Sequence, residues 1–164
     1  MKTLILMRHA KAASPAPGQR DHDRPLAPRG LRSAAALGDW LRAQGYLPQR
    51  ALVSDARRTV ETFEGLGLSG TELTLLPQLY DAGQGDYLTA LRDRTEDSIM
   101  LIGHNPAIGA LAGSLLGDTP VPPGLSAVPT GATFVFACDA HDWAGLSRHP
   151  IRFLDGTVPR DLAD

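Results

Sequence analysis

Two histidines of this chain stand directly after short apolar runs. Arg8 and His9 follow the run 3–7, and His104 follows the run 98–102. A neutral imidazole keeps an unprotonated nitrogen near neutral pH, so a histidine can act as the nucleophile in group transfer. A neighbouring arginine favours that neutral form, because it disfavours a second positive charge. The pattern therefore makes His9 the candidate nucleophile.

An arginine pair follows a third short apolar run. Arg57 and Arg58 stand early in a helix that we expect to begin near residue 55 and to run through Thr62. Side chains four residues apart overlie one another on a helix, which places Ser54, Arg58 and Thr62 on one stripe. Arg57 points about a quarter turn away from that stripe. It is therefore either a phosphate ligand or a solvated, ion-paired helix residue.

Residues of this kind are suited to phosphoryl transfer, in which charge spreads over three oxygens and catalysis is mostly positioning and neutralisation. Arginine forks and the amides of helix N-termini supply the donors. We expect Arg8 and Arg58 to clamp the oxygens, with His104 and the amides after it as further donors. Lys11 is a candidate contact at the rim of the site. Asn105 is a candidate substrate ligand or, alternatively, the N-cap of the next helix, with proline following it.

The elements that must position these residues follow from the hydrophobic pattern. Short β-rich runs alternate with longer helical patterns, which favours a mainly parallel sheet covered on both faces. The fold class is therefore α/β, a three-layer αβα sandwich, in a single domain over residues 1–164. A polar, proline-bearing loop over 13–28 is expected to cover the site. Strands are expected near 3–7, 51–54, 73–76, 98–102 and 132–138, an antiparallel edge strand over 148–154, and helices over 31–44, 55–62 and after Asn105.

Composition excludes several other classes of protein. The formal net charge is −2, so no overall field draws the chain to nucleic acid or to an acidic membrane. The single cysteine, Cys138, excludes an internal disulfide framework and a cysteine-rich zinc cluster. The N-terminal apolar run is too short for a signal peptide or a membrane span. We expect a cytoplasmic protein; the sequence leaves its oligomeric state open.

Taken together, these motifs resemble the histidine phosphatase superfamily (branch 1, phosphoglycerate mutase-like) along most of the chain. Within it the sequence is similar to the SixA-type phosphohistidine phosphatases. Residue Ala27 departs from that pattern, which usually has serine or threonine there, and touches no catalytic position. The resemblance is carried by Arg8-His9-Ala10-Lys11, Asp23-Arg24-Pro25-Leu26 before Arg29-Gly30, the stripe Ser54, Arg58 and Thr62, Leu79-Tyr80-Asp81-Ala82, and Gly103-His104-Asn105-Pro106.

The resemblance implies a phosphatase that needs no metal or cofactor and passes the phosphoryl group through His9. Its expected substrate is a protein of signalling or phosphotransfer that carries phosphohistidine. Asp81 is the candidate general acid, and a turn or N-cap aspartate is an equal alternative. The phosphorus–nitrogen bond is labile and imidazole is a better leaving group than an alkoxide, so a weakly supported acid favours the phosphohistidine substrate. The short chain also lacks room for the inserted caps of relatives that act on sugar phosphates.

Three alternatives remain open at this point. The first is an enzyme that hydrolyses a small phosphomonoester such as a nucleotide or sugar phosphate. The second is a noncatalytic phosphate-binding module, although retention of both His9 and His104 argues against it. The third is a metal site that would add His22 to those two histidines. Arginines beside the histidines would repel a divalent cation, and no HExxH spacing occurs.

Overall fold

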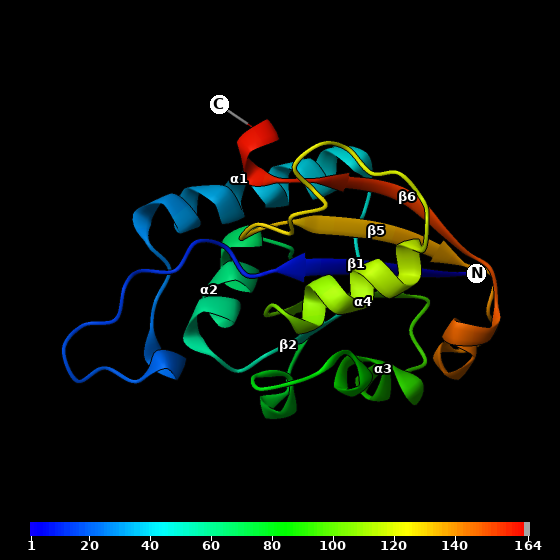
Figure 1. Ribbon diagram of the computed structural model, residues 1–164, viewed down its shortest axis with the longest axis horizontal. Coiled ribbons are helices and arrows are strands. Elements are labelled where there is room, and N and C mark those ends of the chain that lie inside the picture. Colours follow the sequence, from blue (N-terminus) through cyan, green and yellow to red (C-terminus); the bar gives the residue numbers. More distant parts are fainter. Residues whose placement is uncertain (163–164) are drawn as a thin grey trace.

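The computed structural model describes residues 1–162, and they form a six-stranded sheet between two helical layers (Figure 1). The strand order is β3-β2-β4-β1-β5-β6. The first four strands in chain order run parallel, and the last two are antiparallel to their neighbours. The predicted αβα fold with its mainly parallel sheet is confirmed. The strands are β1 (Lys2–Arg8), β2 (Arg50–Val53), β3 (Glu72–Leu75), β4 (Ser98–Gly103), β5 (Thr133–Cys138) and β6 (Ile151–Thr157).

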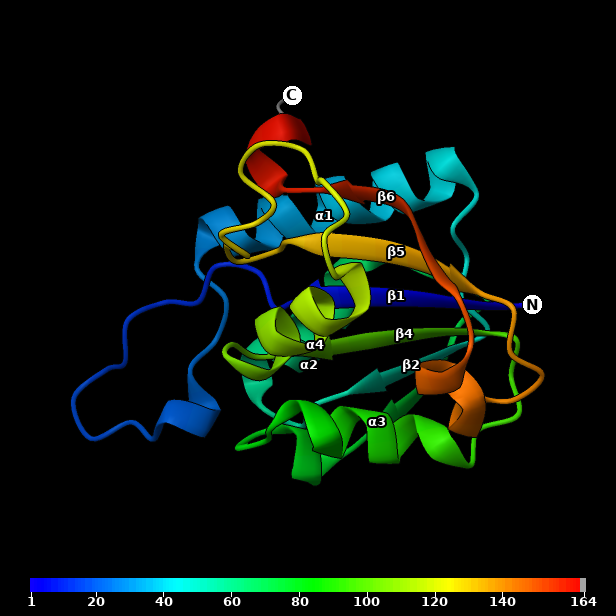
Figure 2. The ribbon, with the colours of Figure 1, turned by 45° about the vertical axis from the view of Figure 1, so that its right-hand side comes forward.

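Four α-helices within the described residues cover the two faces of this sheet (Figure 2). Alternate residues of a strand point to opposite faces. Leu4 and Leu6 of β1 accordingly join the core under α3 and α4, whereas Ile5 and Met7 join the core under α1 and α2. Burial on both faces explains why β1 and β4 read as continuous apolar runs. The helices are α1 (Pro28–Gln44), α2 (Arg57–Leu66), α3 (Gln84–Arg92) and α4 (Ala107–Leu116).

Several boundaries differ from those expected. Helix α1 begins at Pro28, three residues before the predicted start, because proline suits the first helical position. Helix α2 begins at Arg57 rather than near residue 55. The sequence pattern predicts no helix over α3, because its buried stripe is only Tyr87 and Leu91. The edge strand β6 is antiparallel to β5 as expected, but it starts at Ile151 because a 3₁₀ helix occupies 143–148.

The carboxyl ends of β1, β2 and β4 open on one edge of the sheet, where the polar loop of the N-terminal third lies (Figure 1). An isolated bridge between Ala12 and Leu26 closes the base of this loop. The amide of Leu26 also donates to Glu61 Oε1 at 2.8 Å, which ties the loop to α2. The fold thus brings three strand ends and one tethered loop together. Within residues 1–162, no helix is both long and apolar enough to cross a bilayer.

Candidate active site

A cavity of about 250 Å³ lies at this edge of the sheet. Six of the eight residues predicted for the site from the sequence line this cavity, and two lie elsewhere. Four of its lining residues are cations, and none carries a carboxylate. Such a set favours a small anion with several oxygens. The lining residues are Arg8, His9, Lys11, Ala12, Arg24, Arg58, His104, Asn105 and Thr130.

His9 follows the last residue of β1 and is held by the neighbouring strand. Its amide donates to the carbonyl of Gly103 at 3.0 Å, and its Nδ1 lies 2.7 Å from the carbonyl oxygen of Ala10. A carbonyl can only accept, so Nδ1 carries the proton and the neutral ring leaves Nε2 unprotonated. Burial, followed by the charges of Arg58 and Arg8, lowers the pKa of His9 to about 4, against the opposing effect of the Ala10 hydrogen bond. The ring is therefore uncharged at neutral pH, as a nucleophile requires.

His104 lies beside His9, with 5.3 Å between their ring centroids. Its Nε2 is 2.9 Å from Ser54 Oγ, and its amide donates to the hydroxyl of Tyr87 at 3.2 Å. Burial, followed by the effect of His9, lowers the pKa of His104 to about 3. Gly103 is required before it, because a Cβ at that position would lie 1.9 Å from the Tyr87 hydroxyl oxygen. The end of β4 is thus packed tightly against α3.

The helix α2 presents the predicted stripe to the strand ends. Arg58 and Thr62 are buried on one face of α2, as expected, whereas Ser54, also buried, lies before the helix and not on it. Thr62 Oγ1 donates to the carbonyl of Arg58 at 2.7 Å and accepts from the amide of Ala10 at 3.0 Å. One hydroxyl therefore fixes α2 against the residue that follows the candidate nucleophile.

The covering loop contributes a carboxylate that holds Arg58. Arg58 Nη1 donates to the carbonyl of Asp21 at 2.8 Å, and Nη2 donates to Asp21 Oδ2 at 3.0 Å. The hydroxyl of Tyr80 donates to the same carboxylate, and Arg24 Nη1 donates to Oδ1 at 3.0 Å. The Tyr80 hydrogen bond and then those from Arg24 and Arg58 hold the pKa of Asp21 well below its usual range. Asp21 is therefore ionised and orients two cations of the cavity.

Arg8 is anchored from the other side of the cavity. Its Nη1 donates to the carbonyl of Val128 at 3.1 Å, and the same carbonyl accepts from Asn105 Nδ2 at 3.1 Å. Val128 has φ of 48°, an uncommon conformation for a β-branched residue. Arg8 Nε is buried without a hydrogen-bond partner among the described residues. An unmet buried donor is costly, so this atom favours a ligand that accepts from it.

Asn105 is not the N-cap that was one of its two expected roles. Pro106 occupies the N-cap of α4, and Asn105 Oδ1 accepts from the amide of Gly109 at 3.1 Å. The side chain therefore ties α4 to the Val128 carbonyl while lining the cavity. Asn105 thus accepts from an amide in the first turn of α4, as an N-cap would, although it stands one residue before the N-cap Pro106.

Two proposed residues do not line the cavity. Arg57 has a side chain that is 55% exposed and donates to Glu61 Oε2 at 3.0 Å, an ion pair within one helical turn. Asp81 is exposed in the turn after Tyr80. Lys11 is exposed but lies in the lining.

Sequence reasoning also missed several residues of the site. Arg24 and Thr130 line the cavity, and Asp21 and Tyr87 position its arginine and histidine. Arg24 lies within a motif that carried the resemblance, which was the available signal. The others had no signal in spacing, because they reach the site from separate loops and from α3. Within residues 1–162, no three histidine, cysteine or acidic side chains are grouped so that they could hold a metal ion.

Comparison with known proteins agrees with this geometry. The sequence profile of the histidine phosphatase superfamily (branch 1) matches residues 4–98, which include His9 and Arg58 and end before His104. An uncharacterised protein of Mycobacterium tuberculosis is 39% identical over 109 residues, covering 65% of this chain and 67% of its own. The phosphohistidine phosphatase SixA of Escherichia coli is 32% identical over 125 residues, covering 71% and 76%.

A solved structure extends the similarity to almost the whole fold. It comes from Nakamurella multipartitia and is provisionally described as the phosphohistidine phosphatase SixA. It superposes with a TM-score of 0.83 at 30% identity and covers 96% of each chain. The chain therefore belongs to the histidine phosphatase superfamily, branch 1, and is a phosphatase of the SixA type.

Proposed function

We propose that this phosphatase hydrolyses phosphohistidine on a protein substrate and passes the phosphoryl group through His9. The observation that carries the choice of substrate is the lining of the cavity, in which four cations and two histidines meet no carboxylic acid. An alkoxide leaving group needs a proton from a positioned acid, whereas the imidazole of phosphohistidine leaves far more readily. The geometry therefore suits a phosphoramidate better than a phosphomonoester.

The proposed reaction begins with attack of His9 Nε2 on phosphorus. Nδ1 keeps its proton and donates a hydrogen bond to the Ala10 carbonyl, 2.7 Å away, which keeps the ring oriented and lets Nε2 act as the nucleophile. The other ring nitrogen of the substrate phosphohistidine carries a proton, so when the phosphorus–nitrogen bond breaks the imidazole leaves with the bonding electrons as a neutral ring. Arg8 and Arg58 neutralise the oxygens, with Asp21 holding the Arg58 fork in place. Water then attacks the phosphorylated His9, and the bond between phosphorus and Nε2 breaks. This releases dihydrogen phosphate and restores the neutral ring of His9 with its proton on Nδ1.

To donate a hydrogen bond to the phosphoryl group, neutral His104 must carry its proton on Nδ1. Its Nε2 contacts Ser54 Oγ at 2.9 Å, so the Ser54 hydroxyl must donate to Nε2 for Nδ1 to carry the proton. The neutral ring can then donate one hydrogen bond to an oxygen. An incoming phosphoryl dianion raises the pKa of both histidines, because it opposes the arginines that lower them.

The size of the cavity and the state of the nearest carboxylates support the same choice. A volume of about 250 Å³ lies below the roughly 300–1,000 Å³ of pockets that enclose drug-sized ligands. It fits a phosphoryl group with its attached ring better than a whole nucleotide. Asp21 is ionised and holds Arg58, so it is a poor proton donor. Asp81 is exposed outside the lining, and we therefore assign it no role in the proposed reaction.

The test combines trapping with a substrate panel. Wild type and His9→Ala protein are mixed with a peptide phosphorylated on histidine, quenched in alkali, where phosphohistidine survives, and digested for mass spectrometry. We expect phosphate on His9 in the wild type and neither label nor turnover in the variant. Normal turnover by His9→Ala would refute the nucleophile. Efficient hydrolysis of alkyl phosphates, with no activity on phosphohistidine, would assign the enzyme to small phosphomonoesters instead. A chelator should leave the phosphatase activity unchanged. If the chelator abolished the activity and an added metal ion restored it, the result would support the alternative of a metal site.

A further inference from the structure

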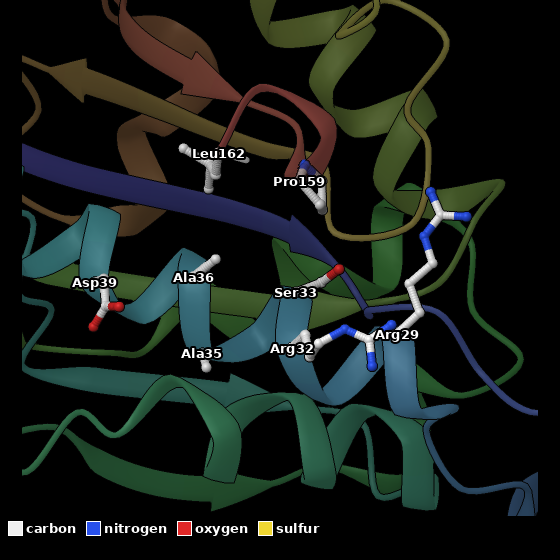
Figure 3. A pocket seen from close by; sticks show the side chains of 8 residues that line it. All are labelled: Arg29, Arg32, Ser33, Ala35, Ala36, Asp39, Pro159 and Leu162. Atoms are coloured by element: carbon white, nitrogen blue, oxygen red, sulfur yellow. The ribbon is translucent and has the colours of Figure 1, made fainter. Parts of the chain in front are cut away.

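Two further cavities continue from the phosphate site along α1. A cavity of about 280 Å³ shares Lys11 and Thr130 with the phosphate site. A second, of about 520 Å³, shares Arg29, Ser33 and Pro159 with the first. Figure 3 shows side chains of α1 on one side of the second cavity and Pro159 on the other. We call these two adjoining cavities the α1 groove.

Basic residues line the α1 groove. Lys11 and Arg29 line its first part, together with Arg160, and Arg32 lines its outer part. Lys11, Arg29 and Arg32 make no ion pair with any residue of the described chain. Arg160 approaches Asp161 only at 4.0 Å, with both side chains more than half exposed. The groove therefore presents a row of cations that no carboxylate within residues 1–162 neutralises in a close ion pair.

Half of the fourteen arginines in the sequence are closely paired with a carboxylate within residues 1–162. Seven of them form ion pairs at 3.1 Å or less with a carboxylate: Arg20, Arg24, Arg42, Arg50, Arg57, Arg58 and Arg94. Among residues 1–162, Asp39 is the one carboxylate in the groove lining, and it accepts from Arg42 Nη2 at 2.7 Å. Asp39 is thus already paired and does not neutralise the row.

Helix stability does not account for these cations. Arg29 is the second residue of α1 and Arg32 is the fifth, and the first turn of this helix contains no acidic residue. The N-terminal end of a helix is the positive end of its dipole, where a cation is unfavourable. Arg29 extends from α1 away from the helix body (Figure 3) and lines the same cavity as Gly124. Arg160 packs on Gly124, where a Cβ would lie 2.7 Å from its Nη2.

We propose that the α1 groove binds an acidic stretch of the protein that carries the phosphohistidine. This inference rests on the proposed function, because the groove begins at the rim residue Lys11 of the phosphate cavity. Carboxylates beside the phosphohistidine would meet Arg29 and Arg160 first and Arg32 farther along. A nucleotide is the less suitable occupant: no aromatic side chain lines either part, so a base has no stacking surface.

The experiment compares two peptides of one sequence phosphorylated on a central histidine with phosphoramidate. One has three glutamates on each side of the phosphohistidine, and the other has glutamines at the same positions. Release of phosphate gives kcat/KM for each peptide at low and high ionic strength. Nitrophenyl phosphate and adenosine diphosphate serve as small substrates for the same enzymes.

Two triple variants remove the same number of charges. The groove variant is Arg29→Gln/Arg32→Gln/Arg160→Gln. The matched control is Arg92→Gln/Arg148→Gln/Arg152→Gln, built on three exposed arginines that form no ion pair within residues 1–162 and lie outside the groove. None of the six residues lines the phosphate cavity. Both variants should therefore hydrolyse nitrophenyl phosphate at the wild-type rate.

The wild type should prefer the glutamate peptide by about tenfold at low salt, because each exposed charge pair contributes a few fold and three act together. Salt should reduce the preference by screening it. The groove variant should lose the preference, and the control variant should keep it. Rates equal within error for the two peptides in the wild type, or equal loss in both variants, would overturn the proposal while leaving the phosphohistidine activity intact.

Two other outcomes separate the α1 groove from the proposed function. If neither peptide is hydrolysed while nitrophenyl phosphate is, the proposed function fails and the inference fails with it. If the groove variant loses hydrolysis of adenosine diphosphate but keeps the peptide preference, the groove binds a nucleotide and the proposal is refuted.

Discussion

Arg57 and Arg58 offer a sharp test of the site, because they are adjacent, share one helix and carry the same charge. The side chain of Arg58 is 9% exposed and lines the phosphate cavity. The side chain of Arg57 is 55% exposed and pairs with Glu61 on the outer face. Replacing each with glutamine removes one charge from the same stretch of chain, so any difference in activity reports the direction in which the side chain points.

The expected magnitudes differ by more than a factor of ten. Loss of one preorganised donor to a developing oxyanion costs about 2.7–4 kcal/mol, or roughly 10²–10³ in rate. Arg58→Gln should therefore lower kcat/KM by about that factor. Arg57→Gln removes an exposed helical ion pair worth about 0.3–0.5 kcal/mol of stability, and it should change kcat/KM by less than about twofold. Arg58→Lys keeps the charge but loses the planar fork, so an intermediate loss is expected.

The assay measures kcat/KM on the phosphorylated peptide and on nitrophenyl phosphate for all three variants. Denaturant unfolding serves as the control for folding. Arg58→Gln also loses its bonds to Asp21, whose side chain is 53% exposed, so the cost in stability should stay near about 1 kcal/mol or below. Equal losses of activity for Arg57→Gln and Arg58→Gln, with both proteins folded, would refute the assignment of Arg58 to the cavity face of α2 and Arg57 to its exposed face.

Three further predictions follow from the pKa values and packing of the site. The acid limb of kcat/KM should have its midpoint near pH 4, the pKa of buried His9, and a midpoint near the ordinary 6.5 after correction for substrate ionisation would contradict a buried neutral nucleophile. His9 and His104 have pKa values of about 4 and 3 when folded, below their ordinary 6.5, so the stability of the neutral forms is present above pH 6.5 and is lost as pH falls. In denaturant unfolding, the free energy of unfolding of the wild type should fall by several kcal/mol from pH 6.5 to 4.5. His104→Asn should show about half that slope. An unchanged slope in the variant would show that His104 does not have a lowered pKa in the folded protein. Gly103→Ala should destabilise the protein by about 1–3 kcal/mol and lower its activity, because the added Cβ would clash with the Tyr87 hydroxyl. Gly83→Ala is the control, because a Cβ at that position would meet no atom within 4 Å. Equal stabilities of the two variants would contradict the packing of Gly103 against Tyr87.

Asp81→Asn tests the residue that the sequence favoured as the acid. Because Asp81 is exposed and outside the cavity lining, the variant should hydrolyse both alkyl phosphate and phosphohistidine at nearly wild-type rates. A loss of about a hundredfold or more on alkyl phosphate alone would restore it as the general acid.

The sequence by itself determined the framework and the main chemistry of this protein. Short continuous apolar runs and helical stripes of period near four are local patterns, so they predicted β1, β4 and the buried positions Arg58 and Thr62 of α2. His9, Arg58 and His104 could be placed at one sheet edge because parallel strands open there. Boundaries moved by a few residues, and α3 went unnamed because two buried residues are too few to define a stripe.

Only the tertiary structure decided how those residues are held and what surrounds them. The Arg8 guanidinium depends on a carbonyl 120 residues away, and the Arg58 fork on a carboxylate 37 residues away. Neither partner could be found from periodicity in the sequence. Each lies in a connecting segment whose position depends on how the chain folds back onto the sheet. The same closure brings Lys11, Arg29 and Arg160 into one groove. The sequence fixes the composition of a loop, but the packed strands and helices determine where its side chains end.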